Sequence, residues 1–300
     1  MESKILLESG TNELELLVFE VGGNKYGINV AKVREIRPSE PVTIIPNSHP
    51  HIEGIFMPRD VIITAVNLAK VLNLPESANP KSDMFIVTNF NKLNVSFRVH
   101  RVVGIERISW AEIIVPDKTI NSSDSAIATG VVRIRGDLIL ILDFESIVAD
   151  ISPETGLQTS DVDKLVGREP SDVPIVIAED SHLLTQLIVD SLHKSGYTNI
   201  TKNENGQQAW ELLCKYKQEG SLKKNVGCVI TDIEMPLMDG HRLTKLIKDG
   251  DATRDIPVVI FSSLVNEEMM KKGEALGADA QISKPEIGKL VRIMDGLLLK

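Results

Sequence analysis

The sequence predicts two domains: an all-β N-terminal half and an α/β C-terminal half built on a parallel sheet. Its 300 residues are too many for one ordinary small core and suggest two domains of about 150 residues each. Short β-type runs between Gly, Asn and Pro turns dominate the first half, whereas apolar strands alternate with amphipathic helical stretches in the second. Polar residues and turn residues fill positions 151–172. We therefore expect domains at 1–150 and 173–300, joined by a linker at 151–172.

The N-terminal half contains runs that are typical of strands, and it repeats itself. The clearest runs are residues 14–20, 61–66, 84–88 and 138–142. Residues 26–36 resemble residues 95–105, and residues 54–60 resemble residues 130–136. A strand and a short helix-like segment follow each copy. This pattern predicts two similar β-rich units, each a small barrel, with chance similarity between β-rich sequences as the alternative.

The C-terminal half alternates between the two patterns expected of βαβ units. Apolar strands are predicted at residues 174–178, 228–231, 258–261 and 280–283, and helices at 182–194, 207–216, 241–248, 267–276 and 286–299. Such alternation predicts a parallel sheet with helices on both faces. In these sheets the loops after the carboxyl ends of the strands carry the functional site.

Charge and cysteine content exclude several classes of function. Residues 1–150 carry 15 Lys and Arg against 19 Asp and Glu, and residues 151–300 carry 18 against 23. Neither half is basic, which argues against a nucleic-acid-binding protein. The two cysteines, Cys214 and Cys228, form neither a disulfide framework nor a zinc motif. No apolar stretch approaches the ~20 residues of a membrane span, so we expect a cytoplasmic protein without direct membrane insertion.

Acidic residues follow two of the predicted strands at the edge where a site is expected. Glu179 and Asp180 end the first strand, and Asp232 ends the strand at 228–231. Three converging carboxylates repel one another unless a cation neutralises them. Hard oxygen ligands without His or Cys favour Mg²⁺, and the backbone carbonyl of Glu234 could supply another oxygen. The sequence therefore predicts a magnesium site at this edge.

A hydroxyl and a lysine complete the predicted site. Ser262 closes the strand at 258–261, and Lys284, followed by Pro285, closes the strand at 280–283. A metal-bound carboxylate can act as a nucleophile toward a phosphoryl donor, and a lysine and a hydroxyl can stabilise the charge that develops. Each of these residues by itself would be interpreted as an ordinary solvated turn residue. The ordered set, with one member after each apolar strand, favours phosphoryl chemistry at Asp232.

Residues 173–300 resemble response-regulator receiver domains, chiefly through the stretch 232–240, which reads DIEMPLMDG. The resemblance implies a flavodoxin-like fold with a parallel five-stranded sheet. It also implies that Glu179 and Asp180 are magnesium acids, Asp232 the phosphoacceptor, Ser262 the switch hydroxyl and Lys284 the phosphate-contacting lysine. The family often has an aromatic switch residue where this chain has Gln281, so the read-out of phosphorylation is expected to differ. Glu234 beside the site is expected to alter access of hydrolytic water.

Residues from about 14 to 148 are similar to CheW-like coupling domains. The similarity lies in residues 26–37, 44–46 and 54–60. It implies a pair of intertwined five-stranded barrels. By similarity, a surface that docks chemoreceptor helices or the kinase lies near Val33, Glu35, Ile36, Gly54 and Arg59. The alternative for Val33 and Ile36 is that they are plain core residues. The alternative for Arg59 is that it forms a structural ion pair with an acidic neighbour.

His49 and His51 form a further, separate pair in this half. They flank Pro50 in a loop-like stretch. Two loop histidines without further ligands are more often surface residues than metal ligands.

The combination of a CheW-like domain with a receiver resembles the CheV class of chemotaxis coupling protein. It implies an adaptor, not an enzyme, whose only chemistry is phosphotransfer to Asp232 and autodephosphorylation. The implied partners are methyl-accepting chemoreceptors and the histidine kinase CheA, in membrane-associated arrays. The alternative is a phosphate sink, in which Asp232 drains phosphoryl groups from the kinase and the coupling domain only localises it. A regulator with DNA output is disfavoured because no helix-turn-helix pattern follows the receiver and the charge is acidic.

Overall fold

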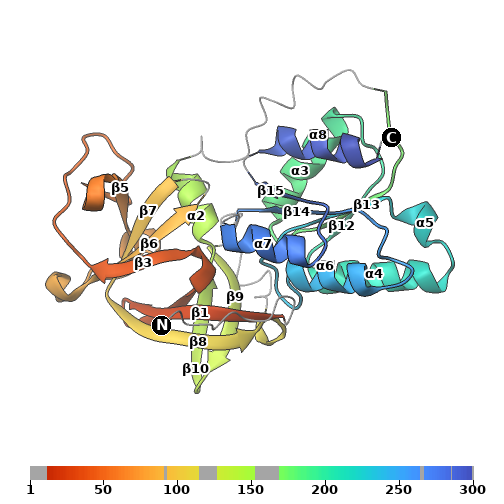
Figure 1. The fold of residues 1–300 in the computed structure, drawn as a ribbon. Coiled ribbons are helices and arrows are strands. Elements are labelled where there is room, and N and C mark those ends of the chain that lie inside the picture. Colours follow the sequence, from red (N-terminus) through yellow and green to blue (C-terminus); the bar gives the residue numbers. More distant parts are fainter. Residues whose placement is uncertain are drawn as a thin grey trace. The chain divides into compact units, whose positions relative to one another are not determined.

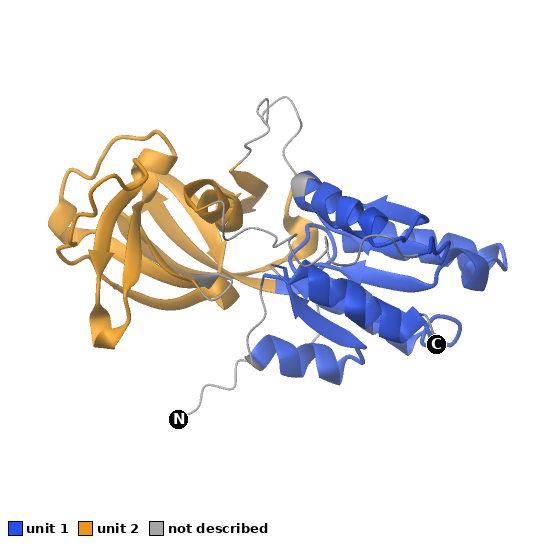
Figure 2. Ribbon diagram, turned by 90° about the horizontal axis from the view of Figure 1, so that it is seen from above, with its two compact units in different colours: residues 1–13, 154–300 blue, residues 14–153 orange. Residues whose placement is uncertain are grey.

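The computed structural model describes residues 12–90, 93–114, 127–152, 169–263, 267–284 and 286–298. The chain forms two compact units, one of residues Leu14–Pro153 and one of Met1–Glu13 with Glu154–Lys300 (Figure 2). Most of the predicted linker, residues 153–168, lies outside the described residues. Among the helices that are described, none is both long and apolar enough to cross a membrane.

The first unit, which we call the β unit, contains two five-stranded sheets (Figure 1). One sheet has the order β8-β1-β2-β10-β9, with bounds Arg101–Ser109, Glu13–Val21, Asn24–Asn29, Asp137–Leu142 and Ala128–Ile134. The other has the order β3-β6-β7-β5-β4, with bounds Val33–Pro38, Met84–Phe90, Leu93–Val99, Ile63–Asn67 and Ile52–Phe56. Short 3₁₀ turns lie at Val30–Lys32, Pro58–Asp60, Pro80–Ser82 and Trp110–Glu112.

The two sheets have the same strand order once the sequence repeat is taken into account. The repeat pairs β2 and β3 with β7 and β8, and it pairs the hairpin of β4 and β5 with that of β9 and β10. With these equivalences, four strands of each sheet have counterparts at the same positions of the other, and β1 and β6 occupy the remaining equivalent position. The chain passes from one sheet to the other between β2 and β3 and returns between β7 and β8, so each sheet contains strands from both repeats. The predicted pair of intertwined five-stranded barrels is confirmed in these two five-stranded sheets.

A short helix follows the last strand of each repeat. Helix α1 (Leu68–Val71) begins after Asn67, whose side chain accepts a hydrogen bond from the backbone N–H of Lys70. Helix α2 (Phe144–Ile151) begins in the same way after Asp143, which accepts from the N–H of Ser146 at 3.0 Å. Asn and Asp at this position satisfy backbone donors that a helix start leaves unpaired.

Aromatic side chains fill the core of the β unit. Phe144, the first residue of α2, is fully buried and lies edge-on to Phe97 with ring centroids 4.6 Å apart. It also meets Phe19 of the other sheet at 6.1 Å. These rings come from both sheets and from α2, so their burial joins the two repeats into one core.

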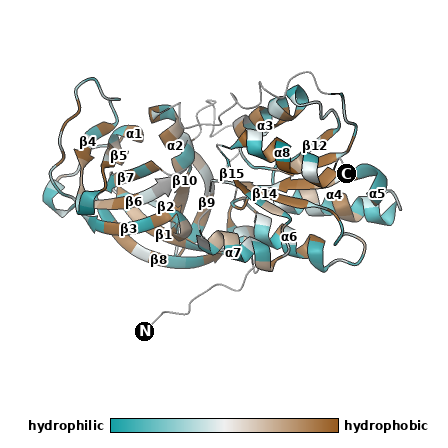
Figure 3. Cartoon of the chain, turned by 45° about the horizontal axis from the view of Figure 1, so that its top comes forward, coloured by the Kyte–Doolittle hydropathy of each residue, from teal (hydrophilic) through white to brown (hydrophobic). Residues whose placement is uncertain are grey.

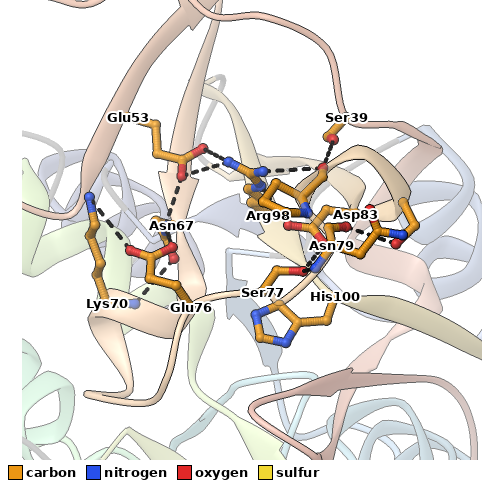
Figure 4. Close-up of polar contacts among 12 residues, drawn as sticks. Ser39, Glu53, Asn67, Lys70, Glu76, Ser77, Asn79, Asp83, Arg98 and His100 are labelled. Atoms are coloured by element: carbon orange, nitrogen blue, oxygen red, sulfur yellow. Dashed lines mark hydrogen bonds and ion pairs between the residues drawn. The ribbon is translucent and has the colours of Figure 1, made fainter.

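A partly buried network of hydrogen bonds and ion pairs also stabilises the second sheet (Figure 4). The Arg98 guanidinium donates to Asp83 Oδ2 at 2.8 Å and to both carboxylate oxygens of Glu53 at 3.0 and 3.2 Å. Asn67 donates to Glu53 at 2.8 Å and to Glu76 at 3.0 Å. Asp83 is only 1% exposed, and a charge so buried is tolerated because Arg98 pairs with it.

The second unit, which we call the receiver unit, has a parallel five-stranded sheet with the order β12-β11-β13-β14-β15. The strands are Ile200–Asn203, Ile175–Ala178, Cys228–Thr231, Val258–Ser262 and Ala280–Ser283 in that order. The helices are α3 His182–Lys194, α4 Gly206–Gln218, α5 Leu222–Asn225, α6 Gly240–Asp249, α7 Glu267–Ala275 and α8 Ile287–Leu298. Figure 3 shows the hydrophobic colour of β14, whose residues are all buried. The predicted α/β class is confirmed, and all strand ends that carry the predicted site lie at one edge of this sheet.

Candidate functional site in the receiver unit

Strand register places the predicted site residues beside one another. Ala178, the last residue of β11, pairs with Thr231, the last residue of β13, so Glu179 and Asp232 leave neighbouring strands at the same level. At the same edge, on the other side of β13, Ser262 of β14 pairs with Ser283 of β15. The chain continues directly into Lys284, whose backbone N–H donates to the Ser262 carbonyl at 3.1 Å.

Three carboxylates and one ammonium group meet at this edge. Glu179, Asp180 and Asp232 each place a carboxylate oxygen within 4.8 Å of the others. Lys284 Nζ lies 2.7 Å from Asp232 Oδ2 and 3.2 Å from Glu179 Oε2. Asp232, Glu179 and Lys284 are each 5% exposed or less. The structure therefore brings together the acids and the lysine that the sequence singled out.

The local charge balance of this cluster is negative. Burial raises the pKa of Glu179 well above its usual value; Lys284 opposes this shift, while Asp232 and Asp180 add to it. One ammonium group does not neutralise three neighbouring carboxylates. A small divalent cation with a preference for oxygen ligands would supply the missing charge, so the donor set fits Mg²⁺. Glu234, whose backbone carbonyl was expected to add a ligand, lies half-buried two residues beyond Asp232.

The segment between Asp232 and α6 is held against the end of β13. Ile233 N–H donates to Asp232 Oδ1 at 2.6 Å, and Gly240 N–H donates to the Ile233 carbonyl at 2.9 Å. A Cβ atom on Gly240 would lie 1.8 Å from the backbone oxygen of Asp232. Only glycine permits this approach, which gives a physical reason for glycine at the end of the DIEMPLMDG stretch.

Two further ionisable groups lie at the start of α6. Asp239 caps this helix, because its side chain accepts from the N–H of Arg242 at 2.7 Å. Burial raises the pKa of Asp239 from 3.8 to about 6. Burial also lowers the pKa of His241 from 6.5 to about 4. The sequence analysis assigned no role to either residue, because local patterns give no signal that these groups are buried.

Gln281, at the position where the family often has an aromatic residue, contacts helix α7. Its side-chain Nε2 donates to the carbonyl of Met270 at 2.6 Å. A Cβ atom on Gly273 of the same helix would lie 2.4 Å from the Gln281 side chain. Gln281 is thus packed against α7 by a hydrogen bond from its side-chain amide. Ser262, the expected switch hydroxyl, is fully buried at the end of β14, and Pro285 lies outside the described residues.

The five expected docking residues of the β unit differ in exposure. Ile36 is 39% exposed, whereas Val33 packs partly buried against the core, as its alternative explanation required. Arg59 is exposed, has φ 50° and pairs with no acid among the described residues. Gly54 is buried with φ +151°, and a Cβ there would lie 2.4 Å from the carbonyl oxygen of Thr43. Gly54 therefore lets the backbone of Thr43 approach β4, where Thr43 bridges to Ile55. The fifth residue, Glu35, lies half-buried on β3.

Comparison with known families agrees with this architecture. The model of the CheW-like domain matches residues 15–152, and that of the response regulator receiver domain matches residues 175–295. The chain is 31% identical over 153 residues to the chemotaxis protein CheW of Thermotoga maritima, a match that covers 50% of this chain and 98% of that protein. The crystal structure of the scaffolding protein TtCheW from Thermoanaerobacter tengcongensis matches with a TM-score of 0.41 and 23% identity, and covers 43% of this chain and 88% of that one.

A match over the full length of the chain covers both units together. The chemotaxis protein CheV3 of Helicobacter pylori is 32% identical over 314 residues, which cover 100% of this chain and 99% of that protein. Such a full-length match includes the order of the two domains as well as each domain. The chain therefore belongs to the CheV-type chemotaxis proteins, coupling adaptors in which a CheW-like domain is followed by a response-regulator receiver domain.

Proposed function

We propose that this protein couples chemoreceptors to the histidine kinase CheA and that phosphorylation of Asp232 regulates the coupling. The observation that carries the proposal is the surroundings of Asp232. Its carboxylate lies in a buried cluster with two further acids, 2.7 Å from the Lys284 ammonium group. This arrangement supplies a nucleophile, a cation and a place for a metal ion at the end of one parallel sheet.

The proposed reaction transfers a phosphoryl group from a phosphohistidine of the kinase. A carboxylate oxygen of Asp232 attacks phosphorus, the P–N bond breaks, a P–O bond forms, and the histidine leaves with a proton taken from solvent. Lys284 neutralises charge on the transferred group, since its ammonium already contacts the acceptor carboxylate.

Glu179, Asp180 and Asp232 would hold Mg²⁺, with the carbonyl of Glu234 as a further ligand. When bound, this ion supplies positive charge that permits the acids to stay ionised together and stabilises the phosphoryl oxygens. The raised pKa of Glu179 supports this assignment, because it reflects burial first and then, despite the opposing effect of Lys284, the neighbouring carboxylates of Asp232 and Asp180.

The docking function is assigned to exposed apolar side chains around the β4–β5 turn. Met57 and Ile62 are 63% and 60% exposed, and Arg59 lies between them in the chain. Ile44, 77% exposed, follows Thr43, which bridges to Ile55 of β4. Exposed apolar residues grouped in this way are typical of a protein interface, and receptor helices and CheA are the partners we propose.

Reconstitution tests the regulatory part. Receptor signalling fragments, CheA and this protein would be combined, and CheA autophosphorylation would be followed as receptor ligand is added. We expect Asp232→Asn to preserve kinase activation but to change its sensitivity to ligand. Asp255→Asn, which changes an exposed acid of the same unit, should behave as the unchanged chain. Ligand sensitivity equal to that of the unchanged chain would contradict regulation of the coupling by phosphorylation.

Gln281 favours a second candidate, the phosphate sink. Its hydrogen bond to the Met270 carbonyl fixes β15 to α7 without an aromatic ring that could change position. In a sink, phosphorylation drains the kinase but leaves the adaptor unchanged. The same reconstitution separates the two: if Asp232→Asn alters only the decay of phosphorylated CheA, and not ligand sensitivity, the sink is the correct assignment.

A further inference from the structure

A second cluster of possible metal ligands lies in the β unit, far in sequence from the acidic site. His49 and His51 belong to the segment between β3 and β4, and Asp150 belongs to the last turn of α2. Each of the three offers a ligand atom within 4.8 Å of the other two. His49 Nε2 lies 3.9 Å from Asp150 Oδ2, and the two imidazole rings are edge-on with centroids 4.7 Å apart.

Backbone hydrogen bonds hold the two histidines in place. The N–H of Ile52 donates to the His49 carbonyl at 2.9 Å, which closes a tight turn. The N–H of Asn67 donates to the His51 carbonyl at 2.9 Å, which ties the turn to the end of β5. Asp150 stands on α2, whose first residue, Phe144, is part of the core. The potential ligands therefore stand on anchored elements, as a preorganised metal site requires.

The His51 ring has an unused binding position. Its Nδ1 atom is buried and, among the described residues, has no hydrogen-bond partner. The pKa of His51 is lowered by burial first, then by His49 and Lys70, whereas Asp150 opposes the shift. A neutral imidazole keeps a lone pair that a metal ion can use. A buried nitrogen without a partner costs stability unless a ligand satisfies it.

We propose that His49, His51 and Asp150 bind a divalent transition-metal ion of the Zn²⁺ or Co²⁺ class. Two imidazoles and one carboxylate suit such ions, whereas Mg²⁺ prefers oxygen ligands alone. Ligand atoms around a tetrahedral zinc ion are about 3.3 Å apart, so small side-chain rotations bring the three atoms into range. A water molecule would take the fourth position.

Two features of the site work against the ion and limit its affinity. The backbone N–H of His51 donates a long hydrogen bond to His49 Nδ1 at 3.3 Å. If His49 binds the ion through Nε2, its neutral ring carries a proton on Nδ1, and Nδ1 can no longer accept this hydrogen bond. Lys70 adds a positive charge nearby, although its ammonium lies 3.9 Å from Glu76. The competing assignment is a simple His49–Asp150 ion pair, which would need no metal.

Zinc titration of the full chain, without a histidine tag and after treatment with EDTA, tests the proposal. Calorimetry would be run near neutral pH in excess Mg²⁺, so that Mg²⁺ rather than Zn²⁺ occupies the acidic cluster. In a separate titration, Co²⁺ would serve as a spectroscopic probe. We expect one Zn²⁺ per chain, retained in Asp232→Asn, and a visible Co²⁺ spectrum typical of nitrogen ligation. His51→Gln and Asp150→Asn should each weaken binding at least about tenfold.

Matched controls make the result decisive. His193→Gln changes an exposed histidine at the end of α3 and should bind Zn²⁺ as the unchanged chain does. Binding that survives in both His51→Gln and Asp150→Asn, or that disappears in Asp232→Asn, would overturn the proposal, and so would the absence of zinc binding. None of these three outcomes decides whether Asp232 accepts a phosphoryl group, because the two clusters share no residue.

Discussion

Replacing Asp239 by Asn should stabilise the receiver unit at neutral pH by up to about 3 kcal/mol. Burial raises the pKa of this carboxyl from 3.8 to about 6, and each pKa unit corresponds to about 1.4 kcal/mol. Because the folded pKa is the higher one, the stabilising contribution is complete below the unfolded pKa and is lost as pH rises through about 6. Asn keeps the helix cap, since its side-chain oxygen can accept from the N–H of Arg242 as Asp239 does.

His241 affects the same unit with the opposite sign. Burial lowers its pKa from 6.5 to about 4, so its contribution is complete above the unfolded pKa and is lost as pH falls through about 4. The size is again about 3 kcal/mol. The two groups therefore partly cancel in the pH dependence of the unchanged chain. Only the difference in unfolding free energy between that chain and Asp239→Asn isolates the contribution of Asp239.

Tryptophan fluorescence makes this measurable in the full chain. The sequence contains two tryptophans, of which Trp210 lies on α4 of the receiver unit and Trp110 in the β unit. In a Trp110→Phe background, denaturant unfolding followed at Trp210 reports the receiver unit alone. We expect Asp239→Asn to be more stable near pH 7.5 and the gain to vanish near pH 4. A gain of the same size at both pH values would refute the argument from burial.

Two further substitutions test the packing. Arg98→Met should destabilise the β unit by about 3 kcal/mol, because Asp83 would remain buried without its cationic partner. Arg101→Met removes an exposed ion pair and should change the stability little. Unfolding followed at the tryptophan of the β unit measures both losses, and equal losses would contradict the prediction. Gly240→Ala should slow phosphorylation by about a hundredfold, because its Cβ would displace the phosphoacceptor backbone. Gly296→Ala has open space around its Cβ and should leave the labelling rate unchanged. Similar labelling rates for both variants would refute the steric argument.

Much of the receiver unit could be predicted from its sequence. The buried strands β11, β13, β14 and β15 carry continuous apolar runs, and their order along the chain placed the acids and the lysine at one edge. Strand β12 was not identified by its own pattern, because Ile200–Asn203 is short, half polar and at the edge of the sheet. An edge strand is buried on fewer sides, so it leaves a weaker hydrophobic signal.

Contacts between distant segments could not be predicted. Nothing in the sequence places Asp150 beside His49 and His51, because the packing of α2 on the core brings them together. The same holds for the pairing of Arg98 with Glu53 and Asp83. The similarity to coupling domains singled out Gly54, but it did not predict that this residue is buried against Thr43. Such features depend on tertiary packing, which local patterns do not encode.

The central claim is that a cation-supported carboxylate cluster makes Asp232 a phosphoryl acceptor. The most direct measurement is incubation of the full chain with radiolabelled phospho-CheA and Mg²⁺, followed by mass spectrometry of the labelled peptide. We predict one phosphoryl group at Asp232 that is labile in both acid and base and is released by hydroxylamine, as an acyl phosphate is; it should be absent from Asp232→Asn and strongly reduced when EDTA replaces Mg²⁺. An unlabelled chain, or equal labelling of Asp232→Asn, would contradict the claim.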